Sequence, residues 1–326
     1  MSPPRQQRGM ALLAAILLVA MGTILAASIA YDNAMSARRG TATLSLDEAV
    51  LAAEAAEALA AYVLSEDRKG GGGNLDHAGE RWGQPLGPVE IVPGVMLSAA
   101  LTDMQGRFNL NNLVNNDGVV DQDQLQVFQS LLRKIGLEEK WASLIADWID
   151  TDDQPLQPDG AEDINYLSQI PPYRAPNTSI TSVSELLALP EFGRDRYRRL
   201  SPYVSALPRG ALLNICTAPA VLLDAFASGY EQVDKDDFAT DPVVFAKGRQ
   251  SGCFPTVQDF EAIFDDKPAY ATKQINTKFG TSSNYFRLTS IVAIGTTEFA
   301  LYSLMERQGT GGANLSRPIL RSYTAD

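Results

Sequence analysis

The N-terminal part of the chain carries one long, uninterrupted apolar run. Residues 9–31 read GMALLAAILLVAMGTILAASIAY and contain no charged side chain, with Arg8 before the run and Asp32 after it. As an α-helix with a rise of about 1.5 Å per residue, the run is about 34 Å long, which is enough to cross a bilayer core of ~30 Å. No A-x-A cleavage site with a polar mature start follows it. The pattern therefore predicts a retained membrane helix rather than a removed secretory signal.

The helical pattern continues beyond the apolar run to about residue 68. The segment DEAVLAAEAAEALAAYVL is rich in Ala, Glu and Leu, which have high helix propensity. A glycine run at residues 70–73 ends the pattern. The face expected to pack on a sheet is a stripe at steps of three and four residues: Ala49, Ala52, Ala56, Leu59 and Val63.

Two stretches near the ends of the remaining chain carry β-forming residues. The first predicts strands near residues 88–91, 95–103 and 106–110, separated by turns. The second predicts a hairpin over residues 284–305 that turns around Thr296, followed by a short strand at 319–323.

Between these stretches the pattern is helical, and Pro, Gly and Asp break it into short pieces. Helices between strands that must pair with each other imply an inserted α-helical domain. The predicted helices cover residues 125–135, 139–149, 184–189, 194–200, 219–226 and 257–264.

The composition narrows the function classes. The chain has 326 residues and a net charge of −12, and this acidity argues against nucleic acid as a partner, because binding it needs a basic footprint. Arg5 and Arg8 favour a cytoplasmic N-terminus, but Arg38 and Arg39 also flank the span, so the charge rule alone does not decide the orientation. Translocation of the long C-terminal body is the better-supported prediction. His77 is the single histidine, which leaves little room for a Ser-His-Asp mechanism. We therefore predict that the chain is not an enzyme.

The chain has two cysteines, Cys216 and Cys253. In an exported protein an even pair favours one disulfide, and the alternative is two buried free thiols. A bridge across this loop would contribute roughly 3–4 kcal/mol in the chain-entropy model.

Residues 147–163 form the richest chemical feature, with seven carboxylates and no Lys or Arg between residues 141 and 173. Such a cluster needs a cation or abundant water to offset its repulsion, and hard oxygen ligands on an irregular loop suit Ca²⁺. The spacing is not that of an EF-hand, because Pro155 stands where that loop needs glycine. The alternative is a solvated acidic loop in which Asp153 or Asp163 caps a helix.

The start of the apolar run resembles the prepilin-type signal of the type IV pilin superfamily. A short basic leader ends in Gly9, and the apolar run continues from Met10. The resemblance implies that a membrane peptidase cuts between these residues and methylates the new amine. Pilins carry Glu five residues into the mature chain, whereas this chain has Ala14.

The missing glutamate is one of several features that resemble the type II (general) secretion pathway protein K family. The others are FNLNNL at 108–113, ADWIDTDDQPLQPDGAEDINYL at 146–167, SELLALPEFG at 184–193 and LNICTAPAVLL at 213–223. The resemblance implies an α+β fold, in which a long N-terminal helix packs on an antiparallel pilin-like sheet and a large α-helical insertion holds two SAM-like units.

The expected domains follow from this resemblance. A leader at 1–9 precedes a membrane helix at 10–31 that continues to about 68, and residues 69–110 and 275–326 form the sheet domain. The insertion covers 111–274, with units at about 111–205 and 206–274.

The resemblance also implies calcium in the acidic segment. The first choices as ligands lie in or beside its proline-containing loop: Asp152, Asp159, Glu162 and Asp163, with Asp150 next.

The function implied is that of a minor pseudopilin at the tip of the type II secretion pseudopilus, anchored in the inner membrane with its body in the periplasm. The expected partners are other minor pseudopilins, the prepilin peptidase and secreted substrates, with no nucleic acid. The alternative is a membrane-anchored periplasmic adaptor that recognises exported substrates.

Overall fold

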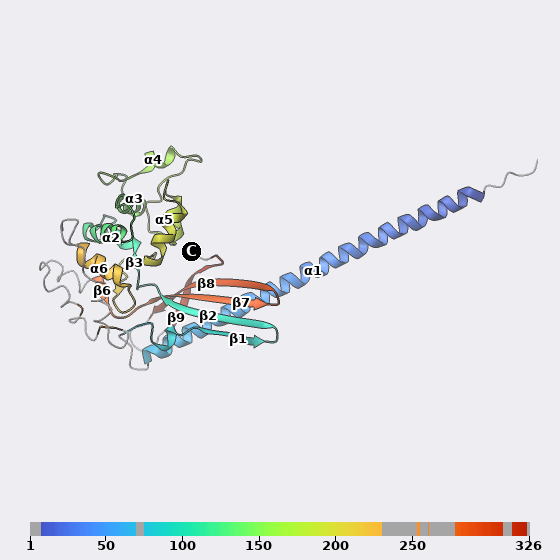
Figure 1. The fold of residues 1–326 in the computed structure, drawn as a ribbon, viewed down its shortest axis with the longest axis horizontal. Coiled ribbons are helices and arrows are strands. Elements are labelled where there is room, and N and C mark those ends of the chain that lie inside the picture. The colour runs from blue at the N-terminus through green and yellow to red at the C-terminus, as the bar shows by residue number, and fades with distance from the viewer. Residues whose placement is uncertain are drawn as a thin grey trace, which may run out of the picture.

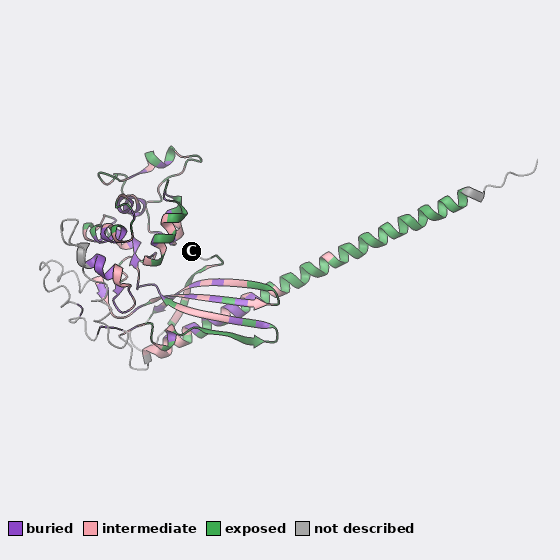
Figure 2. Cartoon of the chain, in the orientation of Figure 1, coloured by how far each residue is buried: buried purple, intermediate pink, exposed green. Residues whose placement is uncertain are grey.

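The computed structural model describes residues 8–69, 75–229, 253–254, 260, 278–308 and 315–324. The helix α1 spans Arg8–Lys69 without a break. Its N-terminal half projects away from the rest of the molecule, and its C-terminal half lies along a sheet (Figure 1). Residues 10–34 are exposed throughout, as Figure 2 shows along the projecting ribbon. Within the described chain, α1 alone is long and apolar enough to cross a membrane.

Five antiparallel strands form the sheet in the order β1-β2-β7-β8-β9. The half of α1 that lies along the sheet packs against β7, β8 and β9. The predicted α+β class, with a long N-terminal helix on an antiparallel sheet, is therefore confirmed. The strands span Leu86–Val92 (β1), Val95–Asp103 (β2), Tyr285–Ile294 (β7), Thr297–Gln308 (β8) and Leu315–Ser322 (β9).

Two strand predictions need correction. The strand expected at 106–110 is only β3, Phe108–Asn109, which pairs in parallel with β4, Val204–Ser205, outside the main sheet. Phe108 is buried in the helical core, so the chain has already left the sheet at this point. The last strand begins at Leu315 rather than at 319, because its pairing with β8 extends to Gln308.

The face of α1 that meets the sheet differs from the predicted stripe in its second half. Ala49, Ala52 and Ala56 are buried as predicted, but Leu59 is exposed and Val63 is only half-buried. The buried positions beyond Ala56 are Ala60 and Leu64. From Ala56 onward the buried face follows two steps of four, whereas the prediction took a step of three from Ala56 to Leu59.

The inserted region leaves the sheet after β2 and returns at β7, and these two strands are neighbours with Asp103 opposite Phe286. It has its own apolar core, separate from the core under α1. Its helices are α2 (Gln122–Lys134), α3 (Lys140–Ile149), α4 (Asp163–Leu167), α5 (Gly193–Leu200) and α6 (Ala220–Gly229), with a 3-10 helix at Val183–Ala188.

A disulfide joins Cys216 and Cys253 inside this region, as the even cysteine pair predicts. Both residues are buried in the core of the inserted region. The helix expected at 257–264 lies almost wholly outside the described residues. The division into two units near residue 205 stays a prediction for the same reason.

Candidate metal centre

Three carboxylates converge where α3 ends and α4 begins. Asp147 lies in the last turn of α3, Asp150 directly follows that helix, and Glu162 is the residue before α4. Each offers one carboxylate oxygen, and these oxygens lie within 4.8 Å of one another. All three side chains are buried, with exposures of 0%, 2% and 5% respectively. We call these three residues the α3–α4 cluster.

The carboxylate oxygens of the α3–α4 cluster outnumber the hydrogen-bond donors that reach them. Asp147 accepts hydrogen bonds from the backbone N–H groups of Leu156 at 3.1 Å and Ala161 at 2.8 Å. In contrast, Oδ1 of Asp150 and both carboxylate oxygens of Glu162 are buried and have no hydrogen-bond donor. Among the described residues, no lysine or arginine forms an ion pair with any of the three. Buried anionic oxygens without a donor or a counter-charge are costly to maintain.

Burial and mutual repulsion raise the pKa of each of these carboxyl groups. Burial, the largest cause, raises the pKa of Asp147 to about 6 and, together with the charges of Asp147, Asp152 and Asp153, that of Asp150 to about 7. The pKa of Glu162 rises to about 8 for the same two reasons. Ion-free carboxylates at these positions thus resist ionisation near neutral pH, and a bound cation would reverse this preference.

The backbone around the α3–α4 cluster requires a glycine at residue 160. A Cβ atom there would stand 2.2 Å from Oδ2 of Asp147 and 2.3 Å from the backbone nitrogen of Leu156. The loop therefore closes tightly over Asp147, and this closeness lets the backbone N–H of Ala161 reach the same carboxylate.

The oxygen ligands of the α3–α4 cluster suit a hard divalent cation. Calcium prefers carboxylate, carbonyl and water oxygens, and three buried carboxylates with unused lone pairs provide the charge and part of the six to eight oxygens it takes. A bound calcium ion would cross-link the end of α3 to the start of α4.

The structure places the five predicted calcium ligands differently from one another. Asp150 and Glu162 belong to the α3–α4 cluster, whereas Asp152 and Asp159 are exposed and outside it. Asp152 accepts a hydrogen bond from the backbone N–H of Gln154. Asp163 points to the chain beyond α4, where it pairs with Arg174 at 3.1 Å.

Sequence reasoning left Asp147 out of the predicted ligand set. The available signal was its position, one helical turn before Asp150 on the apolar helix WASLIADWI. A carboxylate on the apolar face of a helix needs a hydrogen-bond donor or a positive charge beside it. Where neighbouring carboxylate oxygens lack such donors, a bound cation can supply the charge.

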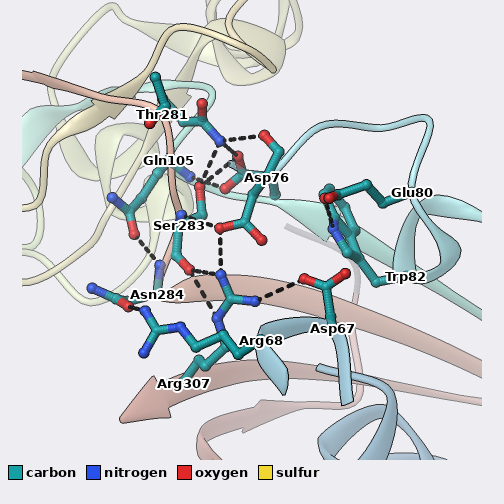
Figure 3. A network of polar contacts seen from close by, with 12 residues as sticks. Asp67, Arg68, Asp76, Glu80, Trp82, Gln105, Thr281, Ser283, Asn284 and Arg307 are labelled. Carbon is teal, nitrogen blue, oxygen red and sulfur yellow. Dashed lines mark hydrogen bonds and ion pairs between the residues drawn. The ribbon is translucent and has the colours of Figure 1, made fainter. Parts of the chain in front are cut away.

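A second acidic group provides an internal comparison. Asp67 at the end of α1, Asp76 and Glu80 also offer oxygens within 4.8 Å of one another. Here Arg307 of β8 enters the group, with an ion pair to Asp67 at 3.2 Å and another to Asp76 (Figure 3). We call these four residues the Arg307 cluster.

Arg307 is almost fully buried, and its guanidinium contacts a backbone carbonyl and an aromatic ring in addition to the two carboxylates. Its Nε donates to the backbone carbonyl of Ser283 at 3.1 Å, and its guanidinium lies 5.0 Å from the ring centre of Phe286. Glu80 accepts a hydrogen bond from Nε1 of Trp82 at 2.7 Å (Figure 3). Burial, then the charges of Glu80 and Asp76, raise the pKa of Asp67 to about 6, and Arg307 opposes the rise. The counter-charge of this cluster is thus part of the chain.

The remaining predicted site residues lie on α1 and in the disulfide already described. Met10 and Ala14 are exposed on the projecting half of α1, and the backbone of Gly9 lies in the same helix. Whether the chain is cut between Gly9 and Met10 stays a prediction.

These features define a pilin-like protein with one apolar stem helix, an antiparallel sheet domain and a helical insertion that carries a cation-type carboxylate cluster. Comparison with known proteins then gives the family. Residues 106–209 match the family model described as type II secretion system (T2SS), protein K. The chain belongs to the type II secretion system protein K family.

Relatives across the whole length support this assignment. The type II secretion system protein K of Pseudomonas aeruginosa is 35% identical over 315 residues, covering 94% of this chain and 91% of the relative. The protein of the same name from Aeromonas hydrophila is 30% identical over 319 residues, covering 93% and 94% of the two chains. The prediction that this chain is not an enzyme agrees with membership of a family of secretion components.

A solved structure has the same fold. A chain in the crystal structure of the GspK-GspI-GspJ complex from the enterotoxigenic Escherichia coli type 2 secretion system superposes with a TM-score of 0.76. It is 24% identical, and the match covers 88% of this chain and 100% of that one. At this identity the similarity establishes the fold.

Proposed function

We propose that this chain is a minor pseudopilin at the tip of the type II secretion pseudopilus, where it initiates or caps the fibre and helps to export folded proteins. The projecting half of α1 anchors it in the inner membrane, and the body lies in the periplasm. The observation that carries the proposal is the inserted region, which forms a second body at the end of the sheet opposite the projecting half of α1 (Figure 1). A subunit that repeats along a fibre leaves little room for such a body, so it fits a fibre end.

Ala14 supports the same position. In pilins the residue at this place is a glutamate that pairs with the N-terminal amine of a neighbouring subunit. A carboxylate inside the membrane is costly and is kept where it has such a partner. Because Ala14 cannot make this pair, we expect the subunit to start the fibre rather than to dock beneath another one.

The proposed partners are minor pseudopilins that correspond to those of the E. coli complex. That complex contains a GspK protein together with GspI and GspJ. We also propose that a prepilin peptidase cuts after Gly9, so that the mature chain begins with a methylated Met10.

Calcium is the proposed cofactor. We assign it to the α3–α4 cluster, keeping Asp150 and Glu162 from the sequence prediction and adding Asp147. The support is the combination of burial, short mutual distance and carboxylate oxygens without donors. The ion would have a structural role, because it would neutralise the cluster and tie the two helices together.

N-terminal sequencing and co-purification of the membrane form test the proposed function. A chain that begins at methylated Met10 and co-purifies with three smaller pilin-like proteins supports it. A chain that begins after Ala27 contradicts it, and so does a body that binds exported proteins but no pilin-like protein, which is the behaviour of an adaptor.

A pair of glutamate variants tests the role of Ala14. Ala14→Glu should change the order of assembly, while Ala15→Glu places the same charge one residue further along and should leave the order unchanged. Both variants should insert into the membrane to the same extent. If Ala14→Glu still assembles only at the tip, the electrostatic part of the proposal is wrong.

A further inference from the structure

The helix α4 and the turn that follows it expose three large aliphatic side chains. Ile164 is 85% exposed, Leu167 is 47% exposed and Ile170 is 99% exposed. Ile164 and Leu167 are three residues apart on α4 and therefore lie on neighbouring positions of one helix face. We call these three residues the α4 patch. Single exposed apolar residues are ordinary on protein surfaces, but three large aliphatic side chains exposed within one seven-residue segment call for an explanation.

The backbone beneath the α4 patch is firmly held. Tyr166, between Ile164 and Leu167, is fully buried and packs edge-on against Trp148, with ring centres 5.1 Å apart. Its ring also lies 5.6 Å from that of Tyr173, whose hydroxyl donates to the carbonyl of Ala188 at 2.6 Å. A segment whose backbone is already held in place needs little further backbone ordering when a partner covers its exposed side chains.

The surroundings of the α4 patch are acidic. Asp152, Asp153 and Asp159 are exposed in the loop before α4. The first two act electrostatically on Glu162, which directly precedes α4, so their charges lie near the patch. The nearest cation along the chain is Arg174, and its charge is matched by Asp163 at 3.1 Å. The net field around the patch therefore attracts positive charge.

The position of α4 leaves the patch open. In Figure 1 α4 lies at the outer end of the inserted region, on the side away from the sheet and from α1. A partner on the patch can therefore bind without displacing the contacts of the stem helix.

We propose that the α4 patch is a docking surface for a protein segment that carries apolar side chains beside lysine or arginine. The apolar side chains cover the patch, and the cationic side chains face the exposed aspartates before α4. This complementarity of charge speeds association and excludes acidic partners. A lipid surface is the less suitable occupant, because anionic headgroups would meet the same carboxylates. The proposal does not depend on where the chain sits in a fibre.

Labelled peptides with the full chain in nanodiscs of neutral phosphatidylcholine provide the test. Fluorescence anisotropy compares three soluble peptides that alternate leucine with lysine, leucine with glutamate, and serine with lysine. Only the leucine–lysine peptide should bind well, and its binding should weaken as salt is raised. Ile164→Ser combined with Ile170→Ser should weaken that binding about tenfold, as expected for the loss of central apolar contacts.

Matched variants distinguish binding at the α4 patch from non-specific apolar binding and from the effects of unfolding. Val119→Ser combined with Leu315→Ser removes two exposed apolar residues elsewhere and should change the affinity less than about twofold. The circular dichroism melting curve should be the same for both double variants. Unchanged peptide binding by the Ile164/Ile170 variant overturns the proposal, as does equal binding of the leucine–glutamate peptide. Binding of the free wild-type chain to phosphatidylglycerol vesicles, if lost in the Ile164/Ile170 variant, would also overturn it in favour of a lipid surface.

Discussion

The α3–α4 cluster and the Arg307 cluster each gather three carboxylates whose oxygens lie within 4.8 Å of one another, yet only the second contains a described cationic side chain. In the Arg307 cluster the chain supplies the positive charge, and Arg307 ties the end of α1 to Asp76 and to the sheet. In the α3–α4 cluster no described cationic side chain pairs with Asp150 or Glu162, and their oxygens lack donors. The comparison teaches that an acidic group by itself does not mark a metal site. The absence of an internal counter-charge in a buried group is the distinguishing feature.

Removal of Arg307 should have the largest effect. Arg307→Met leaves the buried Asp76 and the half-buried Asp67 without their counter-charge, which should lower the free energy of unfolding by about 3–5 kcal/mol. The loss should be equal with calcium and with EDTA, because Arg307 already supplies the counter-charge of this cluster. Urea unfolding measures it, with Arg317→Met as the control. Arg317 is exposed and pairs with Glu306 at 3.4 Å, so its loss should cost at most about 1 kcal/mol.

Calcium removal should have the next largest effect. At a calcium concentration a hundredfold above Kd, binding to the folded state adds about 2.7 kcal/mol to the free energy of unfolding, and EDTA should remove this increment. Glu162→Gln should abolish the increment. In EDTA the same variant should be at least as stable as the wild type, because it removes a buried carboxyl group whose ionised form is disfavoured in the ion-free fold. A Glu162→Gln protein that still gains the full increment would show that the ion binds elsewhere.

The pH dependence of stability should change sign with calcium. The folded pKa values of Asp150 (about 7) and Glu162 (about 8) lie above the ordinary values, so ion-free stability is full at low pH and falls as the pH rises through these values. With calcium bound the carboxylates are held ionised, and stability should rise over the same range. Melting temperatures between about pH 5 and about pH 8 test this. The pKa of Asp67 is also raised, to about 6, so the melting temperatures of Glu162→Gln are subtracted from those of the wild type to cancel its contribution. The same slope with and without calcium would contradict the assignment.

Three conservative changes should have the smallest effect. Asp152→Asn, Asp159→Asn and Asp163→Asn alter predicted ligands that the structure places outside the α3–α4 cluster. Each should leave the calcium increment within about 0.5 kcal/mol of the wild type. Loss of the increment in one of them would restore that residue to the ligand set.

The sequence predicted what depends on local pattern. The apolar run of α1, the β7–β8 hairpin and the helices α2, α3, α5 and α6 follow from periodicity over neighbouring residues, whereas the short helix α4 was not predicted. The family resemblance added the order of these elements. Of the predicted α1 stripe, Leu59 was wrong, because the pattern of alanines admits two faces that differ by one residue.

Long-range neutralisation could not be predicted from the sequence. Arg307 lies more than two hundred residues beyond Asp67 and Asp76, and nothing local to either end shows that they meet. The same limit applied to Asp147, whose burial and nearness to Glu162 depend on the path of the loop that closes over Gly160. Two of the three residues of the candidate site, Asp150 and Glu162, could be predicted because charge density along the chain is a local property.

The most direct test of the difference between the two clusters is a crystal structure of the protein grown with calcium, with the ion located by its anomalous scattering. We expect an ion bound to carboxylate oxygens of Asp147, Asp150 and Glu162, and none in the Arg307 cluster. An ion among Asp67, Asp76 and Glu80, or a fully loaded crystal with none at the α3–α4 cluster, would contradict it.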